Sequence, residues 1–361
     1  MPTDAAKPAC SHDEFSPLLE VVVGTARGAY LPDPHTDRSA WLNLYGDLTA
    51  DQLAGVRGGP VDPRVIEESE EDLDALADTL TALGVRVHRP APVDHSRTHA
   101  TPSWSAPGLY GYCPRDLALV VGSAIIETPS PMRARYHELD TLRHVFTGYA
   151  QAGSVWLAAP KPRLADELYP VDSVGRPVLG DGEPAFEAAN VLRIGRDLLY
   201  LVSASGNEAG LRWLRSVLAL AGEYTVHAVR GVYAYTHIDS TIALIRPGLV
   251  LFNPERVTED TVPAPLRSWD RIWCPPMRDT GTPATGGRPP LSSPWIGMNL
   301  LMVNPRLAVV DAAQTDLIAA LEKHGVDVLP HTLRHARTLG GGLHCVTLDT
   351  VRQGACESYV D

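Results

Sequence analysis

The chain has 361 residues, of which 44% are hydrophobic and 20% are charged, a composition typical of a globular protein. Its formal net charge of −12 disfavours binding to nucleic acids or to anionic membranes, because an acidic surface repels phosphate groups. No segment holds the roughly 20 consecutive apolar residues of a membrane-spanning helix, and the first residues lack the apolar run of a signal peptide, so we expect a cytoplasmic protein.

The five cysteines are an odd number and none belongs to a CxxC pair. This usage is typical of reduced thiols rather than of a disulfide scaffold or a structural zinc cluster. Nothing else in the sequence indicates a metal or an organic cofactor, so none is expected.

The first part of the chain contains few regular elements. Residues 1–16 are polar and aperiodic, and we expect a flexible N-terminus there. Residues 18–24 predict a strand, residues 63–84 predict an amphipathic helix, and VRVHRP at 85–90 predicts a further strand.

Four later segments each contain two short apolar runs separated by a turn rich in Gly, Asn, Asp or Pro, which is the pattern of a β-hairpin. They are residues 117–129, 191–202, 242–254 and 300–312. Helical patterns follow several of these hairpins, at 132–153, 207–222 and 314–325, and a further strand follows each helix.

A hairpin–helix–strand unit that recurs at intervals of roughly 50–70 residues predicts repeated modules in one closed array. The sequence contains no GxGxxG and no GxxxxGK[ST] motif, which disfavours a doubly wound nucleotide-binding fold. Residues 279–294 are rich in Pro and Gly and predict a flexible loop, either a surface excursion or a lid over a site.

Cys345 follows three glycines in LGGGLHCVTLD. Glycines permit backbone conformations and close approaches that other residues exclude, so Cys345 is a candidate nucleophile held at the rim of a cavity. A small buried residue at a glycine-rich turn is the alternative, and this fragment taken alone favours it.

His237 and Asp239 lie two positions apart in THIDST, just before a predicted hairpin. Alternate residues of a strand point to the same side, so the imidazole and the carboxylate would face one cavity. A histidine there suits general acid–base catalysis. A capped turn with a surface histidine is the alternative, and it is favoured for this fragment by itself.

Glu187, in AFEAAN, and Asp116, in CPRD, each stand directly before a predicted buried strand. Either acid alone is readily explained as a turn-forming residue. Together with Cys345, His237 and Asp239, however, they occupy strand boundaries of different repeats. In a closed ring of modules such positions converge on the axis.

Carboxylates gathered around a thiol indicate a cationic substrate, because anions alone raise the pKa of the thiol and suppress its attack. A guanidinium fits, since it is planar, permanently charged and able to form bidentate hydrogen bonds with carboxylates. Its central carbon can accept a thiolate, which gives a covalent thiouronium once the amine leaves.

The chain resembles the arginine:amine amidinotransferases, the family of glycine amidinotransferase and of the inosamine-phosphate amidinotransferases of aminoglycoside pathways. The similarity runs from about residue 110 to the C-terminus, in the segments CPRDLALVVGSAIIETP, APKPRLADELY, FEAANVLRIGRD, HIDSTIALIRPGLVLFNPERV, WIGMNLLMV and LGGGLHCVTLDTVRQG. The resemblance implies an α/β fold, a pentein-type five-bladed α/β propeller of ββαβ modules, in a single catalytic domain over residues 17–361.

The resemblance also implies a ping-pong reaction. Cys345 would take the amidino group from L-arginine and release ornithine, and a small amine acceptor would then remove the group from the thiol. His237 matches the family's proton-transfer histidine, which acts as acid to the departing amine and as base to the incoming one. Asp116 and Asp239 match the carboxylates that hold the guanidinium.

Arg256 and Ser293 match positions that bind the carboxylate end of the donor. Glu187 departs from the glycine and inosamine enzymes, which carry aspartate in this motif. Related arginine deiminases carry glutamate, so the carboxylate that pairs with the histidine is kept and reaches one methylene further. Thr236 and Ala234 stand where the glycine enzyme has methionine and asparagine beside its acceptor, so we expect an acceptor other than glycine.

An amino acid or alkyl amine is the favoured acceptor, in a specialised biosynthetic pathway. An inosamine phosphate is the alternative acceptor, and it is less favoured because no basic cluster for a phosphate is evident in the sequence. The resemblance is compatible with a homodimer, because family members include dimers.

Two other functions compete with amidino transfer. In a deiminase-like hydrolase, water would resolve the same intermediate and citrulline would appear; the segments HIDST and GGGLHC favour the transferase. A non-catalytic propeller acting as a binding scaffold would have lost site residues, yet the cysteine, the histidine and the carboxylates are all present. Cys113 is the rival nucleophile by motif.

Overall fold

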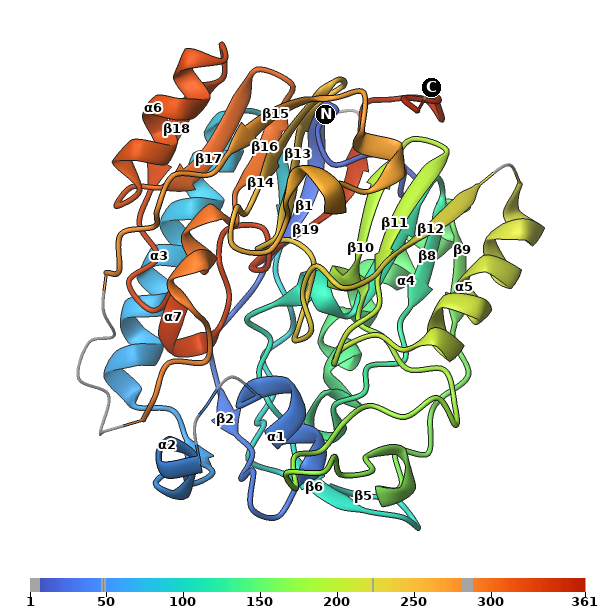
Figure 1. The fold of residues 1–361 in the computed structure, drawn as a ribbon, viewed down its shortest axis with the longest axis vertical. Coiled ribbons are helices and arrows are strands. Elements are labelled where there is room, and N and C mark those ends of the chain that lie inside the picture. The colour runs from blue at the N-terminus through green and yellow to red at the C-terminus, as the bar shows by residue number, and fades with distance from the viewer. Residues whose placement is uncertain (1–6, 47, 49, 223, 281–287, 361) are drawn as a thin grey trace.

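Five three-stranded sheets with the same pairing scheme build the fold in this computed structural model, which describes residues 7–46, 48, 50–222, 224–280 and 288–360 (Figure 1). In each sheet the middle strand pairs antiparallel with one neighbour and parallel with the other. The parallel pairing requires a crossover, and in the predicted units the helix supplies it.

Four of these sheets are continuous in sequence, and the four predicted hairpins form their first two strands. The strands are β7 (Ala118–Val121), β8 (Ala124–Glu127) and β9 (Val155–Ala158); β10 (Val191–Ile194), β11 (Asp197–Leu201) and β12 (Thr225–Val229); β13 (Ile242–Arg246), β14 (Leu249–Phe252) and β15 (Asp270–Trp273); and β16 (Leu301–Asn304), β17 (Leu307–Asp311) and β18 (Asp327–His331). The aliphatic residues of the first two strands of each sheet are largely buried, which explains the short apolar runs of the sequence.

The fifth sheet joins the two ends of the chain. Its middle strand β1 (Leu18–Val23) lies between β19 (Thr347–Arg352), to which it is antiparallel, and β4 (Arg86–His88), to which it is parallel. The segment that follows the candidate nucleophile is therefore anchored against the first strand.

The predicted helices at 63–84, 207–222 and 314–325 are present as α3 (Pro63–Ala82), α5 (Glu208–Ala221) and α6 (Thr315–Lys323). The Asp62 carboxylate caps α3 by accepting from the backbone N–H of Arg64, and Asn207 caps α5 in the same way. In Figure 1 α3 and α6 lie on one side of the sheets and α5 on the opposite side.

Two connections differ from the predicted unit. The predicted helix at 132–153 is instead two 3₁₀ turns, η2 (Arg133–Arg135) and η3 (Glu138–Leu142), followed by α4 (Arg143–Gln151), because the charged side chains of the first turns point inward into ion pairs. Between β14 and β15 the chain forms only η6 (Glu259–Thr261) and η7 (Ala264–Leu266), where two prolines disfavour a helix.

The remaining elements are short. They are β2 (Tyr30–Leu31), β3 (Gly59–Pro60), β5 (Thr98–Ala100), β6 (Ser105–Pro107), α1 (Arg38–Leu44), α2 (Ala50–Ala54), α7 (Ala336–Leu339), η1 (Pro114–Asp116), η4 (Asp166–Leu168), η5 (Ala188–Asn190) and η8 (Pro294–Met298). Three of them, η1, η5 and η8, carry or adjoin candidate site residues.

Of the predicted flexible N-terminus at 1–16, residues 1–6 lie outside the described part of the chain, and residues 9–16 pack against the rest of the protein. Ala9, Asp13 and Phe15 are buried. The backbone N–H of Cys10 donates to the Thr350 carbonyl at 2.9 Å. This polar segment is ordered because its hydrogen-bonding groups find partners on two sheets, which local periodicity does not reveal.

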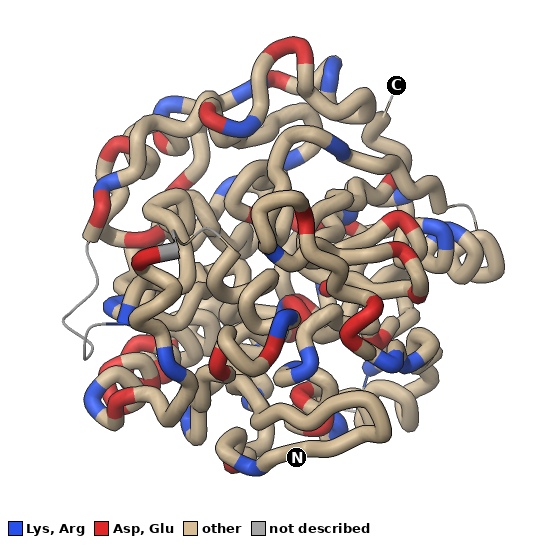
Figure 2. The backbone as a smooth tube through the Cα atoms, turned by 60° about the horizontal axis from the view of Figure 1, so that its bottom comes forward, with Lys and Arg blue, Asp and Glu red and all other residues tan. Residues whose placement is uncertain are grey.

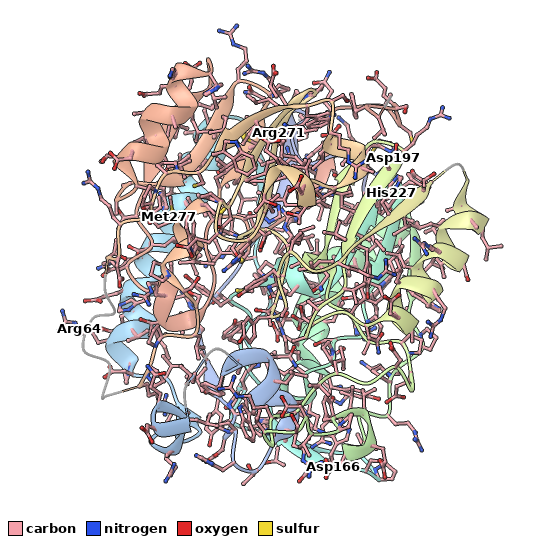
Figure 3. All side chains as sticks on the ribbon, viewed as in Figure 1. Arg64, Asp166, Asp197, His227, Arg271 and Met277 are labelled. Carbon is pink, nitrogen blue, oxygen red and sulfur yellow. The ribbon has the colours of Figure 1, made fainter. Side chains whose placement is uncertain are left out.

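Among the described residues, none of the helices combines the length and the apolar content needed to cross a bilayer. Basic and acidic residues lie intermixed along the backbone in the view of Figure 2. Figure 3 labels one such pair away from the candidate site, His227 and Asp197, whose side chains meet between β12 and β11.

Candidate active site

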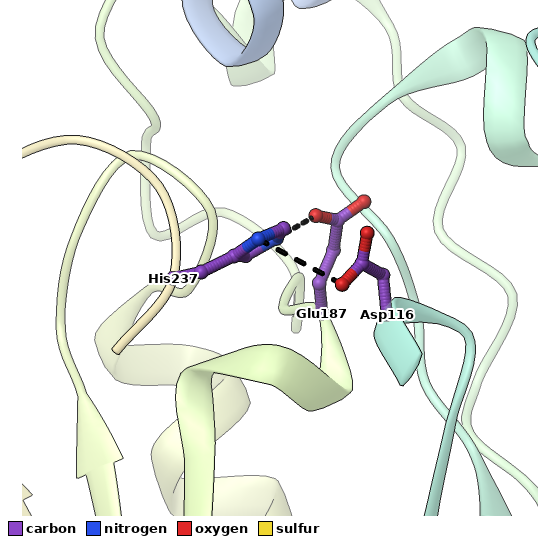
Figure 4. Close-up of side chains that lie close together, drawn as sticks. All are labelled: Asp116, Glu187 and His237. Carbon is purple, nitrogen blue, oxygen red and sulfur yellow. Dashed lines mark hydrogen bonds and ion pairs between the residues drawn. The ribbon is translucent and has the colours of Figure 1, made fainter. Parts of the chain in front are cut away.

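Asp116, Glu187 and His237 form a buried cluster although they approach it from three different sheets (Figure 4). Asp116 ends η1 directly before β7, Glu187 precedes η5 and β10, and His237 lies in the loop before β13. His237 Nε2 lies 2.5 Å from Glu187 Oε2, and its Nδ1 lies 3.7 Å from Asp116 Oδ1. The imidazole is thus held between two carboxylates.

The backbone of His237 has a φ of 63°, in the left-handed region that a side chain with a Cβ rarely adopts. Its N–H donates to Ser205 Oγ at 3.2 Å, and the next N–H, of Ile238, donates to the Ala189 carbonyl at 3.0 Å. Residues 237–239 therefore form a turn, and the expectation that His237 and Asp239 share a strand face is wrong. The surrounding loops hold the imidazole in place, as is common at functional sites.

Cys345 lies between α7 and β19, in the glycine-rich segment that the sequence singled out. Asn299 Oδ1 accepts from the backbone N–H groups of His344 and Cys345, at 2.8 and 3.0 Å. A Cβ on Gly341 would lie 2.5 Å from Cys113 Sγ, and one on Gly342 would lie 2.7 Å from Asn299 Cβ. Glycine is required here by close packing, as predicted.

Asp239 links the thiol to a second buried histidine. The Cys345 thiol donates to Asp239 Oδ2 at 3.4 Å, and His344 Nδ1 lies 2.9 Å from the same oxygen. His344 Nε2 in turn lies 3.3 Å from Glu14 Oε2. The backbone N–H of Arg115 donates to the Cys345 carbonyl at 3.4 Å, so the cysteine lies against η1, which also carries Asp116 of the histidine cluster.

Burial and neighbouring charges shift the pKa values of His237 and Glu187 in opposite directions. Burial lowers the pKa of His237, but Asp116 and Glu187 outweigh it and raise this pKa to about 9. Burial raises the pKa of Glu187, whereas the charge of Arg135 and the hydrogen bond from His237 lower it to about 2. At neutral pH the pair is an imidazolium and a carboxylate.

The pKa of the Cys345 thiol lies well above its usual range. A hydrogen bond with Cys113, burial and the charge of Asp239 all raise it. Burial also raises the pKa of Asp239, but its hydrogen bond from His344 lowers that pKa to about 2. The free site therefore holds a neutral thiol next to a charged carboxylate.

Arg256 and Ser293 are also brought together. Arg256 Nη2 donates to Ser293 Oγ at 3.4 Å, and its Nη1 donates to Ser240 Oγ at 2.9 Å. The guanidinium carbon lies 3.6 Å from the centre of the Tyr233 ring, within the range of a cation–π contact. Sequence analysis did not identify Tyr233.

Two cavities adjoin these residues. A cavity of about 810 Å³ has Ala234, Arg176 and Arg256 in its wall, and a smaller one of about 150 Å³ has Thr236 and Ser293. Neither is lined by Asp116, Glu187 or Cys345, which are buried. The predicted acceptor-side residues thus face open space, and the predicted catalytic residues lie deeper.

Asp116, Glu187 and His237 offer three ligand atoms within 4.8 Å of one another, a spacing that could hold a metal ion. Three of the carboxylate oxygens, however, already accept hydrogen bonds from the cations Arg135 and His237. Only Asp116 Oδ1 accepts no hydrogen bond from the described residues, so most of the donor set is engaged in ion pairs.

Residues 281–287 of the predicted loop at 279–294 lie outside the described residues. The part that follows is fixed to the rest of the chain: the N–H of Leu291 donates to the Arg337 carbonyl at 2.9 Å, and Ser293 begins η8. This end of the loop carries a candidate substrate-binding residue to the site.

No family model matches the chain. Inosamine-phosphate amidinotransferase 1 of Streptomyces glaucescens is 53% identical over 348 residues, which cover 96% of this chain and 98% of that protein. The mitochondrial glycine amidinotransferase of Gallus gallus is 36% identical over 370 residues, covering 98% and 85%. The L-arginine:L-lysine amidinotransferase of Pseudomonas savastanoi pv. phaseolicola is 34% identical over 363 residues, covering 98% and 97%.

Two solved structures place the fold. The inosamine-phosphate amidinotransferase of Streptomyces griseus superposes with a TM-score of 0.91 at 51% identity, covering 98% of this chain and 99% of that one. The dimethylarginine dimethylaminohydrolase of Pseudomonas aeruginosa superposes with a TM-score of 0.59 at 15% identity, covering 92% and 99%.

The superpositions show that the protein has the pentein fold. The identity and coverage of the relatives then place it more narrowly: the chain belongs to the amidinotransferase family and is an enzyme. The family resemblance drawn from the sequence is confirmed, and the alternative of a non-catalytic binding scaffold is wrong.

Proposed function

We propose that the enzyme transfers the amidino group of L-arginine through Cys345 to a small amine and releases ornithine. The observation that carries this proposal is the convergence, in one buried site, of a thiol at Asp239 and an imidazolium clamped between Glu187 and Asp116. These groups match a nucleophile, a proton carrier and anions for a guanidinium.

In the first half-reaction the Cys345 sulfur bonds to the guanidinium carbon, and the bond from this carbon to the ornithine nitrogen breaks. The thiol proton ends on the ornithine amine, and His237 is the proposed carrier. Its pKa of about 9 makes it an available acid at neutral pH. In the second half-reaction the nitrogen of the acceptor amine bonds to the same carbon, and the bond from this carbon to the Cys345 sulfur breaks. The proton that the amine loses returns to the sulfur by the reverse route.

Asp116 is the proposed partner of the donor cation. Its Oδ1 is buried and accepts no hydrogen bond from the described residues. Unpaired buried carboxylate oxygens are costly, and a guanidinium would supply the missing donors. Asp239 would contact the same cation, and Arg256 with Ser293 would bind the carboxylate end of the donor beside the large cavity.

The proposal includes the arrangement of the fold. The five sheets would be the blades of a closed propeller in a single catalytic domain, with Asp116, Glu187 and His237 at the blade edges nearest the axis. The pairing of β1 with β19 supports closure, because it joins the two ends of the chain in one blade.

The favoured acceptor shifts towards an aminocyclitol phosphate, in specialised-metabolite biosynthesis. What supports it is the identity of 53% to an inosamine-phosphate enzyme, against 34% to the arginine:lysine enzyme. A wall of the large cavity also carries Arg176, a suitable partner for a phosphate. An amino acid or alkyl amine remains the second candidate.

Incubation with arginine and a panel containing an aminocyclitol phosphate, lysine and glycine tests both the reaction and the acceptor. We expect ornithine and a new guanidino product, and an intact-protein mass gain on arginine alone that Cys345→Ala abolishes. Cys113→Ala, which removes the neighbouring thiol, should retain the mass gain. Citrulline as the product, or an adduct that survives Cys345→Ala, would contradict the proposal.

A further inference from the structure

Arg135, at the end of η2, lies directly behind the histidine cluster and is not among the residues that the sequence singled out. Its side chain is only 2% exposed. Its Nε and Nη2 donate to the two oxygens of Glu138, at 2.8 and 3.0 Å, and Nη2 also donates to the Cys113 carbonyl at 3.1 Å. These three contacts fix the plane of the guanidinium.

The remaining donor, Nη1, bridges the two acids of the cluster. It lies 2.6 Å from Asp116 Oδ2 and 3.1 Å from Glu187 Oε1. All five N–H groups that an arginine possesses are therefore used. Asp116 and Glu187 precede strands of different sheets, so this one atom ties two sheets together at the site.

The bridge from Nη1 also determines which carboxylate oxygens of Asp116 and Glu187 are available to His237. Nη1 occupies one oxygen of each acid, which leaves Asp116 Oδ1 and Glu187 Oε2 directed at His237. Ser130 Oγ reinforces the arrangement by donating to Glu187 Oε1 at 2.8 Å. Rotation of either carboxylate would break these contacts, and therefore both free oxygens are held in a fixed direction.

The positive charge of Arg135 also compensates the negative charges of the buried acids around it. Three buried acids, Asp116, Glu187 and Glu138, face the same small volume, and like charges without a cation cannot all ionise there. Arg135 and His237 are the cations that face them. Tyr110, whose ring lies 5.7 Å from the guanidinium carbon, and Cys113 complete the surroundings.

We infer that Arg135 is a positioning residue for amidino transfer: it aims and keeps ionised the two carboxylates that hold His237. The inference rests on the proposed function, in which those carboxylates orient the proton carrier and bind the donor. Arg135 itself need not touch the substrate.

The test compares three variants. Arg135→Met removes the bridge and its charge, and Arg135→Lys keeps the charge but not the planar fork of donors. Arg133→Met is the matched control, because Arg133 lies in the same short η2 helix, is equally buried, and binds the Leu164 carbonyl and Asp166 instead of the cluster.

The decisive readout is the acid limb of the pH profile of kcat/KM for arginine. Without the cation the carboxylates need a higher pH to ionise, so the limb of Arg135→Met should move up by about 1–3 units. The limb of Arg135→Lys should stay near the wild-type value while kcat falls by about tenfold or more, since a hydrogen-bonded orientation is lost. Arg133→Met should leave the limb in place.

An acid limb for Arg135→Met that coincides with those of the wild type and Arg133→Met would overturn the inference. If Arg135→Met does not fold, the double variant Arg135→Lys, Ser130→Ala replaces it, with each loss in kcat converted to an activation free energy. A loss in the double variant that exceeds the sum of the losses in the two single variants supports joint positioning of Glu187. Losses that simply add refute it. Activity in Cys345→Ala would instead refute the proposed function, which keeps the two failures distinguishable.

Discussion

Replacing Glu187 by glutamine tests the electrostatic core of the site with a change of charge but almost none of volume. In the wild type, Glu187 Oε2 lies 2.5 Å from His237 Nε2, and this carboxylate together with Asp116 raises the pKa of His237 from 6.5 to about 9. Glutamine can keep a hydrogen bond but not the anion.

The size of the effect follows from the groups that remain. Burial still lowers the pKa of His237, and Asp116 at 3.7 Å becomes the nearest anion. Loss of one adjacent carboxylate should lower the pKa of His237 by about 1–3 units, or about 1.4 kcal/mol for each unit. The proton carrier would then be largely neutral at a mildly alkaline pH at which the wild type is still charged.

The same shift affects stability. A histidine whose folded pKa is raised contributes stability that is fully present below its unfolded pKa of 6.5 and is lost as the pH rises through about 9. In Glu187→Gln this alkaline loss should be smaller and should be complete at a lower pH, because only the folded pKa changes. Urea unfolding on both sides of neutrality measures it.

NMR titration of histidine-labelled protein gives the pKa directly, with His237→Asn identifying the resonance. Asp197→Asn is the matched control, because it likewise removes the charge from a short histidine–carboxylate contact, of 2.6 Å to His227, that does not belong to the cluster (Figure 3). It should leave His237 and the arginine-dependent burst of ornithine unchanged. An unshifted pKa of His237 in Glu187→Gln would refute the reasoning.

Three further changes probe other contacts. Asp239→Asn removes an anion 3.4 Å from the Cys345 sulfur, so the pKa of this thiol should fall; we expect faster alkylation by iodoacetamide at neutral pH together with slower amidino transfer. Gly341→Ala would place a Cβ 2.5 Å from a cysteine sulfur and should cost about 1–3 kcal/mol of unfolding free energy in urea, whereas Gly182→Ala, with open space around it, should cost far less. Arg193→Met removes one of the cations paired with the buried carboxylates of Glu14 and Asp349, which keep Arg115 as a partner, and should lower the unfolding free energy by about 3–5 kcal/mol; a loss below about 1 kcal/mol, the level of an exposed arginine pair, would contradict it.

The repeating part of the fold could be predicted because its signals are local. Each hairpin has its own turn residues and apolar runs, and α3, α5 and α6 follow the helical period within their own segments. Residues 9–16 and 132–142 could not be predicted in this way. Glu14 and Arg135, for example, are buried with partners from distant segments, Arg193 for the first and Asp116 and Glu187 for the second, and a window of sequence does not contain those partners.

Part of the candidate site could likewise be predicted from the sequence, and part could not. Asp116, Glu187 and Cys345 stand next to strands of different sheets, and their positions at strand boundaries could be identified from the sequence. Arg135 was not recognised because an arginine in a polar segment is most often exposed. Its signal was the spacing to Glu138, three residues on, which places a guanidinium and a carboxylate within reach of each other.

His344 and Asn299 were also missed, although each lies within a segment that the sequence singled out. Asn299 accepts from two successive N–H groups, of His344 and Cys345, with a single oxygen. No pattern in WIGMN predicts this, because it depends on how closely Gly342 allows the two loops to approach.

The proposed reaction explains why a neutral thiol is kept among acids. The donor enters as a guanidinium cation and the intermediate on Cys345 is a thiouronium cation, so the charge facing Asp116 and Asp239 stays the same through both half-reactions. Preorganised carboxylates can then stabilise every state without reorganising. The only charge that must move is a proton, and the network of Arg135, Glu187 and His237 is where it can be held. A donor without a positive charge would leave those carboxylates uncompensated, and selection of the cation therefore follows from the same groups that perform the transfer.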